Sequence, residues 1–152
     1  MSHEAKLKEL AIELPPAPAA VGLYAPCVRT GNLVFVSGQV PMKGGAPMLT
    51  GKLGAGVSIE RAAELARQCA LQALAVLRAE LGSLDRVKRV VRVGGFVASA
   101  EGFTDHPKVV NGASQLLIDV FGDAGRHARI AVGLAELPLG VPVEVEFLFE
   151  VE

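Results

Sequence analysis

Residues 143–151 alternate between two kinds of side chain, and this alternation constrains the fold more than any other feature of the sequence. A period of two residues is that of a β-strand, in which successive side chains point to opposite faces of a sheet. We therefore expect a strand with one face toward covering helices and carboxylates on the other. The odd positions are Val143, Val145, Phe147, Phe149 and Val151, and the even positions are Glu144, Glu146, Leu148 and Glu150.

Two amphipathic helices are predicted to cover the apolar face of that strand. Ser58 is a good N-cap and Glu60 suits the positive end of a helix dipole, so the first helix is expected over residues 58–81. Its apolar residues recur every three or four positions and include Cys69, which we expect in the core. The second helix is expected over residues 107–121, with proline at its first position and glycine behind its end.

The N-terminal part of the chain is predicted to form a short helix and then a β-hairpin. Residues 2–13 show a short amphipathic pattern that prolines terminate, so residues 1–14 are interpreted as an accessory element. A coil rich in proline and alanine follows it. The runs 27–30 and 33–40 then flank Gly31-Asn32, a dipeptide that tolerates positive φ, and this pattern predicts the hairpin.

Two more strands complete an α+β fold. Residues 86–98 form a predicted strand that is interrupted at Gly94-Gly95, where we expect a bulge or a close approach of the backbone. Residues 129–137 precede the final strand. Residues 43–57 contain five glycines without the spacing of a phosphate-binding loop, and are predicted to form a loop. The predicted order is ββαβαββ after the accessory helix, in one domain of residues 1–152.

Composition argues against several classes of function. The 15 basic and 16 acidic residues nearly cancel, so the chain lacks the positive field that attracts nucleic acid. The histidines lack the spacing of metal ligands, and we expect neither a metal nor a cofactor. No apolar run approaches the roughly 20 residues of a membrane-spanning helix. Because the N-terminus also lacks a secretory signal, we expect a cytoplasmic protein in which Cys27 and Cys69 are free thiols.

One arginine has unusual neighbours in the strand 129–137. The alternate positions read Arg129, Ala131, Gly133 and Ala135 on one row, and Ile130, Val132 and Leu134 on the other. Small side chains beside a guanidinium leave room for a ligand against the backbone. A planar guanidinium binds a carboxylate through two parallel hydrogen bonds, so a carboxylate ligand is predicted. The alternative is a structural ion pair of Arg129 with Glu144 or Glu146.

Several blocks in combination resemble the YjgF/RidA family, once labelled endoribonuclease L-PSP. The blocks are Tyr24 and residues 31–41, 127–129, 137–140 and 143–146. The resemblance extends from about Tyr24 to the C-terminus. It implies a chorismate-mutase-like fold and a homotrimer with clefts between neighbouring subunits, and it implies no cofactor.

The resemblance also assigns roles to residues of this chain. It implies that Arg129 grips the carboxylate of a 2-imino or 2-aminoacrylate intermediate, and that Glu144 helps to place the water that hydrolyses it to a 2-oxo acid and ammonia. The further residues expected to bind the substrate are Tyr24, Ser37, Gly38, Asn111, Ile130 and Ala131. The chain departs from archetypal members at His127, Ile130 and Ala131, which stand for Pro, a small polar residue and Cys, so it is interpreted as a divergent branch. His127 is predicted at the surface or an interface, with the mouth of the cleft as an alternative.

Two functions of different classes follow from these features. The first is the hydrolysis of reactive enamines and imines. The alternative is a non-catalytic trimer that binds small 2-oxo acids or related carboxylates in metabolic regulation. Ribonuclease activity is disfavoured by the balanced charge.

Overall fold

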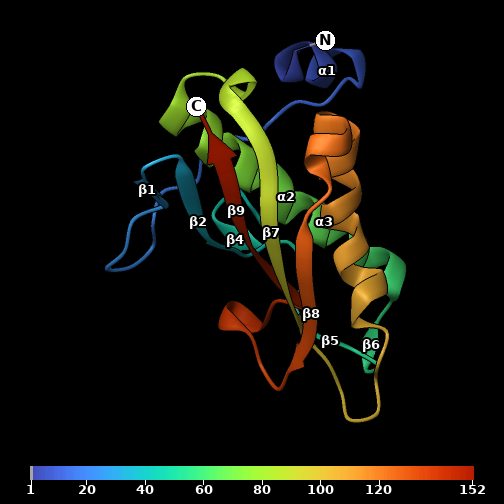
Figure 1. Ribbon diagram of the computed structural model, residues 1–152. Coiled ribbons are helices and arrows are strands. Elements are labelled where there is room, and N and C mark those ends of the chain that lie inside the picture. Colours follow the sequence, from blue (N-terminus) through green and yellow to red (C-terminus); the bar gives the residue numbers. More distant parts are fainter. Residues whose placement is uncertain (1) are drawn as a thin grey trace.

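The computed structural model describes residues 2–152 and has a five-stranded sheet with helices on one of its faces (Figure 1). The helices are α1 His3–Glu9, α2 Ile59–Leu81 and α3 His106–Phe121. The strands of the sheet are β1 Cys27–Thr30, β2 Leu33–Gln39, β7 Val87–Ala98, β8 Ala128–Leu134 and β9 Val143–Val151. This arrangement confirms the α+β class and the predicted ββαβαββ order of the main elements.

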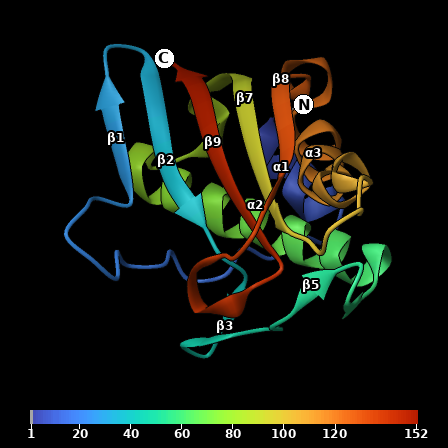
Figure 2. The same cartoon turned by 90° about the horizontal axis from the view of Figure 1, so that it is seen from below.

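The strands lie in the order β1-β2-β9-β7-β8, so β1 and β8 form opposite edges of the sheet (Figure 2). β7 and β8 run parallel, and the other neighbouring strands are antiparallel. The predicted hairpin is confirmed, with Gly31 at φ 58° in its turn. The two edges are important for the site because each carries some of its predicted residues.

The predicted alternation of β9 is confirmed by burial. The five odd positions are all buried, and α2 and α3 pack against this face of the sheet. Cys69 on α2 is fully buried, as expected. The four even positions lie on the opposite face, which no helix of residues 2–152 covers (Figure 2) and which is called the open face below. No helix within residues 2–152 has both the length and the apolar character needed to cross a bilayer.

The glycine pair of β7 allows close packing on both faces of the strand. The predicted interruption at this pair is wrong, because β7 is continuous and its irregular register lies earlier, between Val87 and Arg92. The predicted close approach is confirmed. A Cβ atom on Gly95 would collide with Val110 of α3, and one on Gly94 would lie 2.8 Å from Cγ of Glu146. The absence of side chains here lets α3 approach the sheet closely.

The accessory helix α1 ends at Glu9, earlier than the residue 13 predicted from the prolines. Ala11 adopts a left-handed conformation with φ 53°, and the amide of Ile12 donates to the carbonyl of Leu7 at 2.9 Å. This pattern is a Schellman cap, which usually has glycine at the left-handed position, so its sequence signal is missing. The carboxylate of Glu4 accepts from the amide of Leu84 at 2.9 Å and thereby anchors α1 to the body of the protein.

Two other element boundaries differ from prediction. The strand expected over 129–137 is β8, which ends at Leu134 because its parallel partner β7 ends at Ala98, the residue paired with Leu134. The glycine-rich stretch 43–57 is not wholly loop. It contributes to four two-residue strands: β3 Met42–Lys43, β4 Ala46–Pro47, β5 Lys52–Leu53 and β6 Gly56–Val57.

Candidate functional site

Arg129 lies on the edge strand β8 and is held against helix α3. The register pairs it with Val93, which is buried under the helices, so the Arg129 side chain lies on the helix side of the sheet. Its Nη1 atom donates to Oδ1 of Asn111 at 2.7 Å and to Oγ of Ser114 at 3.2 Å, and both partners are on α3. Arg129 nevertheless remains exposed to solvent. Both bonds use one nitrogen, so the edge formed by Nε and Nη2 stays available for a ligand.

The structural ion pair considered for Arg129 does not form within residues 2–152. Glu146 instead pairs with Arg92, whose Nη1 lies 3.3 Å from Oε1 of Glu146. Glu144 has no basic partner in this part of the chain. The guanidinium of Arg129 is therefore oriented by neutral groups, and its charge is not neutralised by a carboxylate of the same chain.

Glu144 lies on the open face at the start of β9, where it is partly buried. The register pairs it with Phe96 of β7. A Cβ atom on Gly38 would lie 3.2 Å from Cδ of Glu144 and closer still to Oε1, so the missing side chain at Gly38 makes room for this carboxylate. Burial raises the pKa of the Glu144 carboxyl above its ordinary value, and the negative charge of Glu146 raises it further. A carboxyl group with a raised pKa is better matched to proton transfer near neutral pH.

Tyr24 and Ser37 lie at the β1 edge of the sheet. The hydroxyl of Ser37 donates to the carbonyl of Ala25 at 2.6 Å, which ties β2 to the coil before β1. Tyr24 is half exposed, and its hydroxyl accepts from the amide of Val21 at 3.4 Å. Tyr24 and Gly38 both line a hollow of about 380 Å³ beneath the proline-rich coil.

The predicted site residues thus fall into two groups within one chain. Arg129, Asn111 and Ala131 belong to the β8 and α3 edge, whereas Tyr24, Ser37, Gly38 and Glu144 surround β2 and the start of β9. β2 and β8 are three strand spacings apart, which is roughly 14 Å at about 4.8 Å per spacing. Ile130 pairs with Gly94 and points to the open face, away from the face of Arg129. A single chain therefore does not bring Arg129 to Glu144.

One of the small residues beside Arg129 has a structural explanation that the sequence did not suggest. A Cβ atom on Gly133 would lie 2.5 Å from Nε2 of His106 and 2.7 Å from Oγ of Ser99. These two side chains bond to each other at 2.9 Å. Gly133 therefore makes room for the start of α3, and the space predicted for a ligand at this position is filled by protein.

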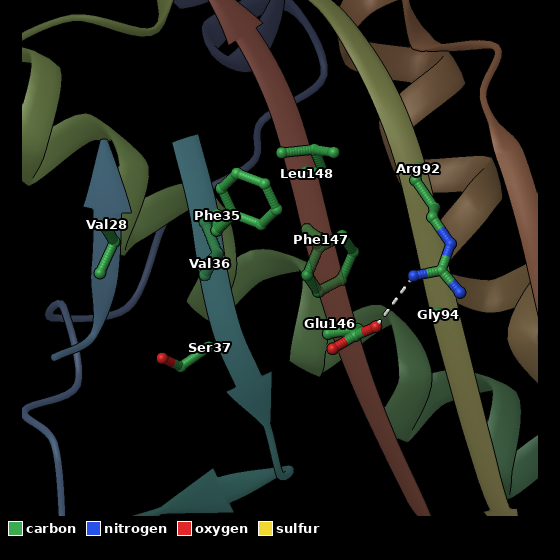
Figure 3. A pocket seen from close by; sticks show the side chains of 9 residues that line it. All are labelled: Val28, Phe35, Val36, Ser37, Arg92, Gly94, Glu146, Phe147 and Leu148. Carbon is green, nitrogen blue, oxygen red and sulfur yellow. Dashed lines mark hydrogen bonds and ion pairs between the residues drawn. The ribbon is translucent and has the colours of Figure 1, made fainter. Parts of the chain in front are cut away.

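Sequence reasoning missed two polar residues of these surfaces. Ser114 is only 8% exposed and bonds to Arg129; its signal was its position three residues after Asn111 on the same helix face. Arg92 lies on the open face beside a hollow of about 390 Å³, where Figure 3 shows it extending toward Glu146. Val28, Phe35 and Leu148 line the same hollow. Among residues 2–152, no group of three or more His, Cys, Asp or Glu side chains is arranged to hold a metal ion.

Comparison with known proteins gives consistent relatives along almost the whole chain. A family model described as "YjgF/chorismate mutase-like, putative endoribonuclease" matches residues 4–151. Protein TCP17 of Trypanosoma cruzi is 47% identical over 147 residues, covering 96% of this chain and 92% of that protein. The 2-iminobutanoate/2-iminopropanoate deaminase of Dermatophagoides farinae is 30% identical over 143 residues, covering 93% and 95%. The crystal structure of a "putative endoribonuclease" from Shewanella oneidensis MR-1 superposes with a TM-score of 0.94 at 33% identity, covering 99% of this chain and 100% of that chain.

Proposed function

This chain belongs to the YjgF/RidA family and has its chorismate-mutase-like fold, and we propose that it hydrolyses reactive 2-enamine and 2-imine carboxylates to 2-oxo acids and ammonia. The observation that supports the proposal is the exposure and the hydrogen bonding of the Arg129 guanidinium. Its guanidinium is exposed, is oriented by Asn111 and Ser114, and has no carboxylate partner within residues 2–152. A fixed guanidinium with a free edge is suited to bind an organic carboxylate through two parallel hydrogen bonds. A relative named as a 2-iminobutanoate/2-iminopropanoate deaminase supports the reaction class.

The proposed reaction needs orientation and proton transfer. Arg129 holds the carboxylate of the substrate, so the adjacent imine carbon takes a defined position. A water molecule adds to this carbon and gives a proton to the carboxylate of Glu144. The nitrogen takes that proton from Glu144, which gives a neutral tetrahedral adduct with one hydroxyl and one amino group. The hydroxyl proton then passes to the nitrogen as the C–N bond breaks and the C=O bond forms, so the products are a 2-oxo acid and ammonia. The raised pKa of Glu144 makes its carboxylate a stronger base for the first proton transfer and brings its proton exchange closer to neutral pH.

We further propose that the site is completed by a neighbouring copy in a homotrimer. One chain holds Arg129 and Glu144 on different faces and different strands, so two chains must contribute if both residues act on one substrate. The open face carries apolar side chains near both edges: Val28 is 57%, Phe35 48%, Ile130 41% and Leu134 39% exposed. Exposed apolar surface of this kind is typical of a face that another protein surface covers. Light scattering should give about three times the 15.8 kDa of one chain.

The test of function is the release of 2-oxobutanoate from 2-iminobutanoate generated in situ. The purified protein should accelerate the release, and Arg129→Ala should reduce kcat/KM by roughly 10- to 150-fold, since a hydrogen bond to a charged group is worth about 1.5–3 kcal/mol. Arg61→Ala is the matched control, because Arg61 is a partly exposed arginine of α2 in a surface pair with Glu64. It should keep full activity.

The result also separates the proposed enzyme from a binding protein. If the wild-type protein gives no acceleration but binds 2-oxobutanoate through Arg129, the chain is a non-catalytic trimer that binds small carboxylates. If it neither accelerates the reaction nor binds the oxo acid, both readings are wrong. The cytoplasmic location stays a prediction.

A further inference from the structure

A chain of hydrogen bonds links the backbone near the start of β8 to the guanidinium of Arg129. Nδ1 of His127 lies 2.6 Å from the carbonyl oxygen of Gly125. Nε2 of the same ring lies 2.9 Å from Oγ of Ser114. Ser114 in turn accepts from Nη1 of Arg129 at 3.2 Å. His127 and Ser114 thus form a continuous path to the arginine that carries the proposed function.

The direction of each bond in this path follows from the chemistry of its atoms. A carbonyl oxygen only accepts hydrogen bonds, so Nδ1 of His127 carries a proton and donates to Gly125. In the neutral ring Nε2 then has a lone pair, and it accepts the hydroxyl proton of Ser114. The lone pairs of the Ser114 oxygen consequently face the guanidinium of Arg129, which can only donate.

The surroundings favour the neutral form of His127 that this arrangement requires. Burial lowers the pKa of His127 below its ordinary value, the positive charge of Arg129 lowers it further, and the bond to Gly125 opposes both effects. The charged group facing the ring from β8 is Arg129, and α3 contributes the neutral Ser114. In the preceding turn, Asp123 and Arg126 pair with each other at 3.6 Å.

We propose that Ser114 and His127 are positioning residues that orient the guanidinium of Arg129, so that its free edge meets the carboxylate of a 2-imino or 2-oxo acid. This inference rests on the proposed function of Arg129. An arginine on an exposed edge strand has many rotamers, and ordering such a side chain costs up to about 2 kcal/mol. Asn111 holds the guanidinium at one point, and Ser114 is a second point of attachment that restricts its rotation.

Ser114 and His127 depend on each other, because Nε2 of His127 lies 2.9 Å from Oγ of Ser114. Ser114 is 8% exposed, and without His127 its hydroxyl proton would have no partner on the β8 side. The histidine and the serine therefore act together, and replacement of either one should loosen Arg129.

The first test measures the tautomer of His127 and the order of the Arg129 side chain directly, and it does not depend on activity. The chain has three histidines, so imidazole ¹⁵N spectra of the labelled protein are simple to assign with His127→Gln as a reference. His127 should be the Nδ1-protonated tautomer at neutral pH, and its pKa should be below about 6.5. The Nε–H signal of Arg129 should be sharp in the wild type and should broaden in Ser114→Ala. A His127 protonated at Nε2, or an Arg129 signal unchanged by Ser114→Ala, overturns the proposal.

The second test separates positioning from simple stabilisation. Ser114→Ala and His127→Phe should weaken 2-oxobutanoate binding and raise KM by roughly 2- to 12-fold, the loss expected for one hydrogen bond, with a smaller change in kcat. His127→Gln keeps an acceptor for Ser114 and should restore most of the affinity. Variants that unfold at a lower temperature but bind 2-oxobutanoate with normal affinity contradict the proposal. A His127→Gln variant that binds 2-oxobutanoate no more tightly than His127→Phe also contradicts it.

The two tests keep this inference distinct from the proposed function. If the wild type binds and hydrolyses its substrates and Ser114→Ala changes neither binding nor KM, the positioning role of Ser114 and His127 is wrong. The proposed function of Arg129 then stands. If the wild type neither binds nor hydrolyses, the proposed function fails. The ¹⁵N spectra then still decide whether Ser114 and His127 hold Arg129 in place.

Discussion

The substitution Gly38→Ala should disable Glu144 while leaving the fold intact. A Cβ atom at this position would lie 3.2 Å from Cδ of Glu144 and closer still to Oε1. Because non-bonded carbon and oxygen atoms prefer separations near 3.5 Å, the carboxylate must move by about 1 Å. The backbone of Gly38 is outside the left-handed region, so alanine itself adds no strain there. A misplacement of about 1 Å at a reacting group can cost on the order of 100-fold in rate.

The assay for Gly38→Ala is a double-mutant cycle with Glu144→Gln. Gly38→Ala alone should lower kcat by about 100-fold. It should change the free energy of unfolding by less than about 1 kcal/mol, since the displaced group is the end of a flexible side chain. In a Glu144→Gln background, alanine at position 38 should cause no further loss, because the affected group is already disabled. Full activity in the single variant, or an equal loss in both backgrounds, would refute the role given to Glu144.

Three further predictions address proton transfer, packing and assembly. The rate should rise with pH as the Glu144 carboxyl ionises above its ordinary pKa, and Glu144→Gln should remove this rise. A carboxyl whose pKa is raised in the folded state lowers the free energy of unfolding as pH increases through that pKa. Glu144→Gln should therefore unfold at a higher temperature than wild type at pH 7, but at the same temperature as wild type at pH 4. Gly112→Ala should lower the unfolding free energy by about 1–3 kcal/mol in urea titrations, because its Cβ would collide with the carbonyl of Ala63 and push α3 from α2. Phe35→Asp should give monomers in sedimentation experiments with unchanged circular dichroism, and trimers of this variant would contradict the assignment of the open face as an interface.

Features that depend on neighbours in sequence could be predicted before the structure. The start and end of α2 are examples. The hydroxyl of Ser58 accepts from the amide of Arg61 at 3.1 Å, and Gly82 closes the helix at φ 82°. Caps and alternation are local properties, so they are visible in a linear pattern. Where a local signal was unusual, as at the left-handed Ala11 of α1, prediction failed.

The candidate site also combines features that a local sequence pattern predicts with features that only tertiary packing sets. The sequence determined that Arg129 stands among small residues on a strand and that Glu144 lies on the face of β9 opposite its apolar row, because both statements follow from a period of two. Only the tertiary structure decided that β8 is an edge strand far from β2, that Asn111 and Ser114 hold Arg129, and that Gly38 makes room for Glu144. These contacts join residues distant in the chain. They depend on strand order and on how closely α3 approaches the sheet, which are settled by packing of the whole core and not by any local pattern.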